Sequence, residues 1–211
     1  MISILPYSLD DENMLNSSSL PGYLIWTPKN TVIVLGRGSK LELAIKEEEV
    51  EKQNIPLYRR PSGGETVVLS PRTLCVSVAV SLAEFNRPAD FFKFCNEIIG
   101  ETLTKLGASG IETSGISDLS MGQQKLLGSS MYKGIDRLFY HAVLNVSEDP
   151  ALFSKLLKHP AREPDYRMGR SHSEFVSSLK IAFPDINPNG LKNELRLRFS
   201  QALLQFKKNQ R

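Results

Sequence analysis

The stretch RRPSGGETVV, residues 59–68, combines side chains and backbone features that bind anions. Gly63 and Gly64 can adopt positive φ angles, which let backbone N–H groups surround a ligand and form a concave anion site. The guanidinium groups of Arg59 and Arg60 match the oxygens of a carboxylate or a phosphate. An ordinary turn with a charged rim produces the same pattern, so this stretch alone leaves a turn and an anion-binding loop both open.

A second candidate region is GQQKLLGSSMYKGIDRLFYHAVLNV, residues 122–146. Lys125 begins an apolar strand that the small residues 128–130 interrupt, and small residues within a strand often mark a bulge or the close approach of a ligand. His141 lies in the next predicted strand, where a single histidine is more often a hydrogen-bonded core residue than a catalytic one. A lysine at the start of a strand is usually solvated, and the glycine and two serines that follow Lys125 weaken that expectation without reversing it.

Several common catalytic and binding motifs are absent from the chain. LGRGSK, residues 35–40, lacks the G-x-x-x-x-G-K-[ST] spacing of a P-loop, and Leu41 breaks the G-x-G-x-x-G pattern of a dinucleotide site. The G-x-S-x-G motif of a nucleophile elbow does not occur. His159 and His172 do not share the spacing of zinc ligands, so the sequence predicts no zinc site.

Length and composition limit the class of protein. The 211 residues predict a single domain, 1–211, with a core large enough to be stable without metals or disulfides. A formal net charge of +3 suits an anionic metabolite, and without a long Lys/Arg run it predicts no nucleic-acid partner. No signal peptide or membrane-spanning run is found, so we expect a cytoplasmic protein without a membrane partner. Cys75 and Cys95 are expected to be core residues, not a disulfide or a metal pair.

Hydrophobic periodicity predicts the strands and helices that must position these residues. Residues 23–27 and 31–36 are predicted to form a hairpin around a Pro-Lys-Asn turn. Pro88 and Gly107 are typical of the two ends of a helix. Helices grouped around a mostly antiparallel sheet indicate the α+β class. The other predicted strands are 55–60, 66–69 and 73–80, then a meander of 111–115, 118–121, 124–132 and 138–146, and the predicted helices are 45–54, 88–107, 149–157 and 189–206.

Three segments of the chain, taken together, resemble the lipoate–protein ligase branch of the biotin/lipoate ligase family. They are RRPSGG (59–64), DLSMGQQKLLGSS (118–130) and DRLFYH (136–141). That family's pattern is R-R-x-S-G-G-G-x-V, then N-D-L and G-x-K-x-S-G-S-A, then a histidine in the next strand. WTPKNTVIVLGR (26–37) is similar to its W-x-x-P-x-V-x-x-G-R segment, and residues 159–179 are similar to the loop and helix that close its catalytic domain. The resemblance implies the α+β catalytic domain that lipoate ligases share with biotin ligases.

The activity implied by this resemblance is that of an ATP-dependent lipoate–protein ligase. Lipoate, or a related medium-chain acid, attacks the α-phosphate of ATP to give an acyl-adenylate and pyrophosphate, while Mg²⁺ neutralises the phosphates. A lysine of a lipoyl (acyl-carrier) domain then attacks the adenylate. The implied partner is therefore the lipoyl domain of a 2-oxoacid dehydrogenase or a glycine-cleavage-type protein. The chain ends without the C-terminal domain that many bacterial ligases carry, so a separate accessory chain is a second candidate partner.

The resemblance also assigns roles to individual residues. Lys125 is the implied catalytic residue, a compact cation that holds the acid against the α-phosphate and stabilises charge on the bridging oxygens. Arg60 would lie over the phosphate or acyl carbonyl, with Arg59 more peripheral. Asp118 would organise the metal or adenine side, and His141 would lie beside the acyl chain. The remaining implied binding residues are Ser62, Gly63, Gly64, Val67, Gly128 and Ser129.

The chain departs from the family pattern at several positions. Glu65 replaces the third glycine of the triplet, Ser117 replaces the asparagine of N-D, and residues 69–73 replace H-D-x-G-N. A carboxylate beside a phosphate is repulsive unless it turns outward or meets a cation. If the backbone at Glu65 required positive φ, the residue would also be strained.

Three alternative functions remain open. An ATP-independent octanoyl or lipoyl transferase needs a cysteine nucleophile, and the position where one branch carries it is Gly110 here. A biotin ligase would carry a G-R-G-R-R-G-R loop, which this chain lacks. A non-catalytic module that binds a small acid or a carrier domain is favoured by Glu65 and opposed by Lys125, Arg60 and His141.

Overall fold

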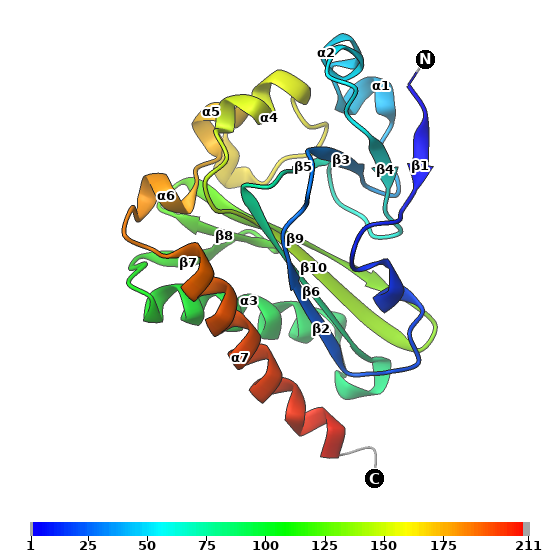
Figure 1. Ribbon diagram of the computed structural model, residues 1–211, viewed down its shortest axis with the longest axis vertical. Coiled ribbons are helices and arrows are strands. Elements are labelled where there is room, and N and C mark those ends of the chain that lie inside the picture. Colours follow the sequence, from blue (N-terminus) through cyan, green and yellow to red (C-terminus); the bar gives the residue numbers. More distant parts are fainter. Residues whose placement is uncertain (1, 209–211) are drawn as a thin grey trace.

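The structure, a computed structural model, describes residues 2–208 and contains two β-sheets that face each other (Figure 1). The larger sheet is antiparallel throughout, with the strand order β2-β6-β10-β9-β8-β7. The smaller sheet is mixed, with the order β1-β4-β3-β5. The strands are β1 (Ile4–Pro6), β2 (Gly22–Trp26), β3 (Val32–Leu35), β4 (Leu57–Arg59), β5 (Val67–Leu69), β6 (Thr73–Ser81), β7 (Ile111–Ser114), β8 (Asp118–Met121), β9 (Gln124–Lys133) and β10 (Arg137–Asn145).

The predicted meander is present as β7 to β10, and consecutive strands are neighbours in the sheet. Gly115 and Gly122 lie in two of its turns with φ angles of 60° and 56°, a conformation that favours glycine. On β10, Leu138 and Leu144 belong to the main hydrophobic core. Because side chains alternate along a strand, His141 faces the opposite side of the sheet. The meander therefore separates a core face from a second face that is available for a site.

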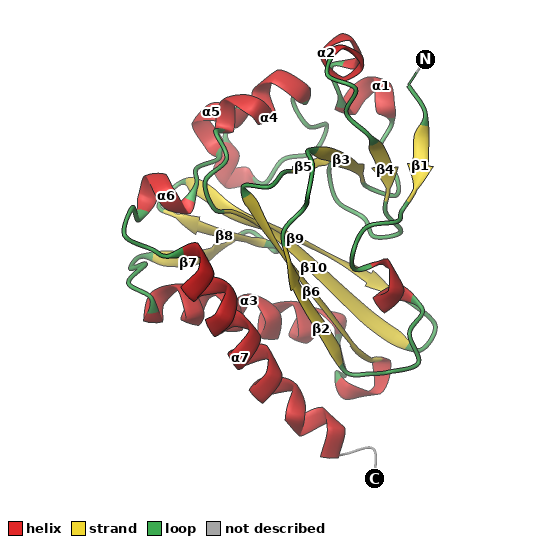
Figure 2. Ribbon diagram, in the orientation of Figure 1, coloured by secondary structure: helices red, strands yellow, loops and turns green. Residues whose placement is uncertain are grey.

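Two long helices cover the core face of the larger sheet, as Figure 2 shows in red. They are α3 (Pro88–Lys105) and α7 (Pro188–Lys208). Pro88 occupies the first turn of α3, and Gly107, with a φ of 96°, follows its end, as predicted. Phe91, Ile99 and Phe199 on these helices are fully buried. Burial of this apolar stripe on one face leaves the helices outside the space between the sheets.

The predicted hairpin of 23–27 and 31–36 is wrong. β2 pairs with β6 in the larger sheet, whereas β3 pairs with β4 and β5 in the smaller sheet. All four residues of β3 are buried, because Ile33 and Leu35 pack toward short helices while Val32 and Val34 pack toward the larger sheet. A strand buried on both faces reads as a continuous apolar run and takes a central position, so it needs a partner on each side.

Short helices cover the outer face of the smaller sheet, where Val50 and Leu156 pack against β3 and β4. Between the two sheets lies a separate cluster that includes Trp26, Leu69 and Cys75. Within residues 2–208, no helix is both long enough and apolar enough to span a bilayer. The shorter elements are η1 (Glu12–Leu15), α1 (Leu41–Ala44), α2 (Glu47–Lys52), η2 (Leu82–Glu84), α4 (Pro150–Leu156), η3 (Asp165–Arg167), α5 (His172–Phe175) and α6 (Leu179–Ala182).

Candidate active site

A cavity of about 810 Å³ lies between the two sheets. Paired strands bring side chains into rows across its floor, and residues two apart on one strand share a face. Because adjacent strands lie about 4.8 Å apart, the floor spans roughly 10 Å from β9 to β6. One row contains Ser130, His141 and Ser77, and the next contains Asp118, Gly128, Val143, Cys75 and Trp26.

Lys125 enters this cavity because of a register shift between β8 and β9. Leu119 faces Leu127, whereas Ser120 faces Lys125, so Leu126 is an extra residue without a partner on β8. An extra residue in one strand re-aims the side chains that follow it. In regular pairing Lys125 would turn toward the core, where Leu126 and Leu127 are both buried. The irregularity lies at Leu126, two residues before the first of the small residues 128–130.

The ammonium group of Lys125 pairs with the carboxylate of Asp118, which also accepts hydrogen bonds from two hydroxyl groups. Lys125 Nζ lies 2.9 Å from Asp118 Oδ1. Ser117 Oγ donates to the same oxygen at 3.0 Å, and Tyr166 Oη donates to Asp118 Oδ2 at 2.8 Å. Burial, followed by the charge of Asp118, raises the pKa of Tyr166, so its phenol stays protonated and donates. Asp118 therefore fixes Lys125 at one end of the cavity.

Gly128 makes room for the Lys125 side chain. A Cβ atom added at residue 128 would lie 2.8 Å from both Lys125 Cε and Nζ, which is closer than van der Waals contact allows. The neighbouring Ser129 donates its hydroxyl to the Ser117 carbonyl at 2.6 Å, and its N–H donates to the same oxygen at 3.0 Å. Both residues thus help to place the Lys125–Asp118 pair.

Arg60 is buried, 4% exposed, and its guanidinium group donates to the backbone. Its Nη2 donates to the carbonyls of Gly63 at 2.8 Å and Glu65 at 2.7 Å, and its Nη1 donates to the Val34 carbonyl at 3.1 Å. Burial lowers the pKa of Arg60 to about 10, which leaves it charged at neutral pH. Arg60 lines the cavity, but these contacts make it a brace between β3 and the loop 61–66.

Arg59, expected to be the more peripheral of the two arginines, is also bound to backbone carbonyls and is not among the residues that line the cavity. Its Nη1 donates to the carbonyls of Gly36 at 3.0 Å and Ser39 at 2.9 Å. The strain considered for Glu65 is absent, because the left-handed conformation falls on Gly64, with a φ of 84°. The Glu65 carboxylate, 38% exposed, turns toward the Arg162 Nε atom 3.9 Å away.

His141 links the sheet to the same loop. Its Nε2 lies 2.6 Å from Ser62 Oγ, and Ser130 Oγ donates to the Gly63 carbonyl at 2.9 Å. Burial, followed by the charge of Arg60, lowers the pKa of His141 to about 3, so the imidazole is neutral. Ser62 and Gly63 hold the loop without lining the cavity. The predicted site residues that do line it are Arg60, Gly64, Val67, Asp118, Lys125, Gly128, Ser129 and His141.

The end of the cavity away from Lys125 is mostly apolar, with a buried carboxyl at its edge. Asp11 accepts hydrogen bonds from Tyr7 Oη at 2.7 Å and Ser77 Oγ at 2.6 Å, and Trp26 Nε1 donates to Ser77. Burial raises the pKa of Asp11. Tyr7 and Asp11 were not predicted as site residues, since nothing in the N-terminal segment indicates that it packs against the cluster between the sheets. The apolar walls are formed by Trp26, Val34, Val67, Leu69, Cys75 and Val143.

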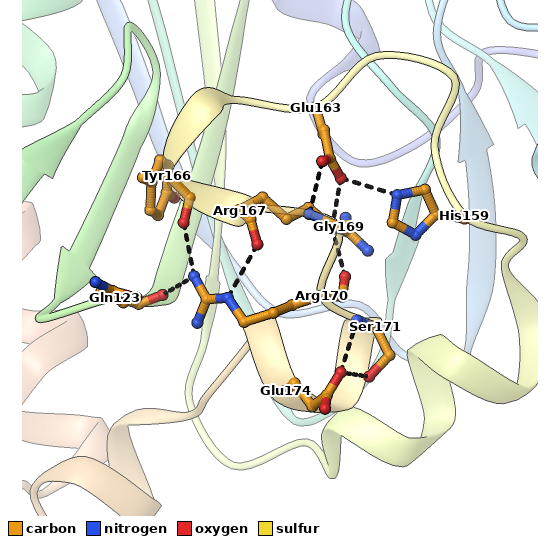
Figure 3. A network of polar contacts seen from close by, with 9 residues as sticks. All are labelled: Gln123, His159, Glu163, Tyr166, Arg167, Gly169, Arg170, Ser171 and Glu174. Atoms are coloured by element: carbon orange, nitrogen blue, oxygen red, sulfur yellow. Dashed lines mark hydrogen bonds and ion pairs between the residues drawn. The ribbon is translucent and has the colours of Figure 1, made fainter.

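The loop between α4 and α5 closes the polar end of the cavity through an internal network (Figure 3). Glu163 contacts His159 at 2.8 Å and accepts the Gly169 N–H at 2.8 Å. Arg170 donates to the carbonyls of Gln123, at 3.0 Å, and Tyr166, at 2.7 Å. The family resemblance of 159–179 pointed to this loop as a closing segment, but it did not single out Tyr166 as the residue that binds Asp118.

Comparison with known proteins identifies a family. The model of the lipoyl protein ligase A/B catalytic domain matches residues 7–200. Lipoate–protein ligase 1 of Staphylococcus aureus is 26% identical over 159 residues, which are 75% of this chain and 48% of that protein. Lipoate-protein ligase A of Psychrobacter cryohalolentis is 28% identical over 151 residues, 71% of this chain and 42% of that protein. The chain thus spans about half the length of the curated relatives it matches.

Solved structures confirm the α+β fold predicted from the sequence. A Thermoplasma acidophilum protein with bound lipoic acid has a TM-score of 0.76 at 20% identity, covering 92% of this chain and 78% of that one. A lipoate-protein ligase A bound with ATP also has a TM-score of 0.76, at 21% identity, covering 96% and 84%. With the match over residues 7–200, these findings show that the chain belongs to the lipoyl protein ligase A/B catalytic-domain family.

Proposed function

We propose that this chain is a lipoate–protein ligase-like enzyme, which activates lipoate or a related medium-chain acid with ATP and transfers it to a lysine of a lipoyl domain. The observation that carries the proposal is Lys125. A register shift directs this lysine into the cavity, Asp118 holds it at 2.9 Å, and Gly128 leaves space for it. A cavity with Lys125 at its polar end and mostly apolar walls at the other suits a ligand that has a carboxylate at one end of an apolar chain.

The dimensions of the cavity support a medium-chain acid. With its carboxylate at Lys125, the chain would cross the sheet beside Val143 and Cys75, with Val67 on the opposite wall. Lys125 Nζ lies over Gly128, and Gly128, Val143 and Cys75 form one row across the sheet. The distance of roughly 10 Å from β9 to β6 is therefore the width that an acyl chain would cross from the lysine to Cys75. A neutral His141 would lie beside this chain without adding a charge to the apolar wall.

The chemistry assigned to Lys125 is electrostatic. Its ammonium group would hold the acid carboxylate in line with the α-phosphorus of ATP, which lowers the entropic part of the barrier. The carboxylate oxygen forms a bond to the α-phosphorus while the bond to the bridging oxygen breaks, and pyrophosphate leaves. Lys125 stabilises the charge that develops on these oxygens. In the second step the acceptor amine forms an amide with the acyl carbon, and AMP leaves.

Mg²⁺ would arrive with the nucleotide. Among residues 2–208 no group of three or more His, Cys, Asp or Glu side chains is arranged to hold a metal ion. Mg²⁺ is commonly bound by one or two carboxylates together with substrate phosphates, which requires no such cage. Asp118 is the candidate carboxylate on this chain, and the ion would supply charge neutralisation for the phosphates.

The ATP-independent transferase is disfavoured by the environment of the cysteines. Cys75 lines the cavity, but burial, followed by the charges of Asp11 and Asp10, raises the pKa of its thiol well above the usual range. A nucleophilic cysteine must be a thiolate, which requires a cationic environment. Cys95 lies on α3 in the main core, away from the cavity.

We further propose that residues 1–211 form the catalytic unit and that an accessory chain and a lipoyl domain are its partners. A bi-partite lipoate protein ligase from Thermoplasma acidophilum, described together with its E2 lipoyl domain, has a TM-score of 0.75 at 21% identity, covering 96% of this chain and 82% of that one. This likeness supports both proposed partners.

ATP–pyrophosphate exchange, with lipoate, octanoate and biotin added separately, tests this function. We expect exchange that depends on lipoate or octanoate, because exchange reports the reversible formation of an adenylate. Exchange with biotin alone would identify a biotin ligase. No exchange with any acid would show that this chain alone is not a competent ligase and would favour a module that only binds the acid or the carrier domain.

A further inference from the structure

Two buried polar atoms at the cavity have no hydrogen-bond partner among residues 2–208, namely Arg167 Nη2 and Thr66 Oγ1. Both residues line the cavity. A third such atom, Glu49 Oε2, lies 3.6 Å from Lys155 Nζ and belongs to neither the cavity nor its loops. Buried polar groups are almost always satisfied, and each unsatisfied one calls for an explanation such as a missing ligand.

The side chain of Arg167 is fixed by its neighbours, so its unpaired Nη2 atom cannot turn to solvent. The residue is 4% exposed, and its Nε donates to the Arg170 carbonyl at 2.9 Å. The same Nε lies 3.4 Å from Glu163 Oε2, and the guanidinium carbon is 4.9 Å from the centre of the Phe175 ring. Stacking and ion pairing therefore fix the plane of the fork and leave Nη2 as a donor without an acceptor.

Arg167 shares the polar end of the cavity with the Lys125–Asp118 pair. It follows Tyr166 directly in the chain, and Tyr166 donates to Asp118. The charges of both Arg167 and Lys125 act on His172, which also lines the cavity. Two cations with different geometries thus lie at the end of the cavity where the proposed reaction would take place.

Thr66 comes from the opposite wall. It is the last residue of the loop 61–66 that Arg60 braces, directly before strand β5, and its neighbour Glu65 faces Arg162 of the closing loop. The hydroxyl of Thr66 and the Nη2 of Arg167 are both donors that would meet an anion between the two loops. A point charge at Lys125 suits one oxygen, whereas a planar fork suits the several oxygens of a phosphate.

We propose that Arg167, assisted by Thr66, binds the phosphate oxygens of ATP that leave as pyrophosphate, a role that rests on the proposed adenylation. When the bond between the α-phosphorus and the bridging oxygen breaks, its electron pair passes to the pyrophosphate. Arg167 faces this additional negative charge, while Lys125 stays with the acid and the α-phosphate. The site would thereby divide the two halves of the reacting triphosphate between two cations.

Calorimetric titration of ATP, inorganic pyrophosphate and octanoate, each with Mg²⁺ present, tests this assignment without requiring turnover. Arg167→Met should weaken ATP and pyrophosphate binding roughly tenfold or more, the usual effect of losing a charged hydrogen bond. Thr66→Val, which keeps the shape, should weaken both about threefold, and Thr66→Ser should restore them. Octanoate affinity should stay within about twofold in every variant. Arg87→Met, on the exposed Arg87–Asp90 pair before α3, is the matched control for a lost surface charge.

The outcomes separate this assignment from the ligase function itself. ATP and pyrophosphate affinities within about twofold of the parent in both Arg167→Met and Thr66→Val would overturn it, whatever the exchange assay shows. A parallel loss of octanoate binding would also overturn it, because the loop would then have only a structural role. If Arg167→Met does not fold, the Thr66→Val and Thr66→Ser pair decides. Weakened ATP binding in a protein without exchange activity would support the phosphate site and contradict the ligase.

Discussion

Two regions of this protein have the same kind of sequence signal, a basic side chain beside small residues, and the structure uses them differently. Arg59 and Arg60, which precede the loop 61–66, have donors that reach backbone carbonyls. Lys125, near the start of β9, places one ammonium group in the cavity, with a single carboxylate as its partner. An arginine fork has five donors that nearby carbonyls can occupy, whereas a lysine offers a compact charge. The donors of the two arginines are thus occupied by the backbone, although Arg60 also lines the cavity, whereas the charge of Lys125 is presented to the cavity.

The strongest test of this contrast is Lys125→Ala. We expect adenylate formation to fall roughly 100- to 1,000-fold, the range for removal of one preorganised electrostatic group. The free energy of unfolding should change little, since Asp118 keeps the hydrogen bonds from Ser117 and Tyr166. Acid-dependent ATP–pyrophosphate exchange and a denaturant titration measure the two quantities.

Lys133→Ala is the matched control for this substitution, because Lys133 is an exposed lysine at the end of the same strand. It should retain exchange activity. A Lys125→Ala protein with full activity would remove the catalytic role of this residue and leave the two regions without a functional difference.

The reciprocal test is Arg60→Met, for which we expect a loss of about 3 kcal/mol of stability. Removal of the guanidinium group leaves the carbonyls of Val34, Gly63 and Glu65 without their donor in a buried position. Arg59→Met should cost about 1 kcal/mol, since its partners lie closer to the surface. A stable Arg60→Met protein that cannot bind ATP would reverse the contrast and make Arg60 a ligand residue.

A smaller effect is expected for Gly128→Ala, which keeps the lysine but displaces it. The added Cβ would lie 2.8 Å from Lys125 Cε and Nζ, and the flexible end of the lysine would have to move. We expect exchange activity to fall roughly tenfold, with stability nearly unchanged, because misplacement of a catalytic group reduces the rate without unfolding the chain. An unaltered rate would show that the position of Lys125 over Gly128 is not the reactive one.

A further test is the pH dependence of stability that arises from His141, which contacts Ser62 in the loop 61–66. The pKa of His141 is lowered to about 3, whereas an unfolded histidine has a pKa of about 6.5. As the pH falls below about 6.5, His141 binds a proton in the unfolded chain but not in the folded chain. Stability then falls by up to about 1.4 kcal/mol per pH unit until the pH approaches the folded value.

Denaturant titrations of the parent protein and His141→Gln between pH 7 and pH 5 isolate this contribution. The variant should lose less stability over this range. His172, whose pKa is lowered to about 4 mainly by burial, gives a slope of the same sign and is present in both proteins. Identical slopes in the two proteins would show that the pKa of His141 does not differ between the folded and the unfolded state.

The sequence by itself determined the longer strands and helices, the class of fold and the positions that carry the family pattern, whereas short elements such as β1 and α6 were not predicted. The meander of 111–146 was predictable because its strands are local, alternate in polarity and meet at tight turns. The ends of α3 were predictable because proline and glycine have narrow backbone preferences. Lys125 was predictable as a candidate because its motif and its position relative to His141 are local features of the chain.

Only the tertiary structure decided how those residues are used. The partners of β2 and β3 depend on pairing with distant strands, so a local turn between them predicted a hairpin that does not form. The direction of Lys125 depends on one extra residue, Leu126, relative to β8, and periodicity alone does not show it. The donors of Arg60 bind carbonyls of two segments that the fold brings together, strand β3 and the loop 61–66. The residue type determines which interactions a side chain can make, whereas long-range packing determines which partner it meets.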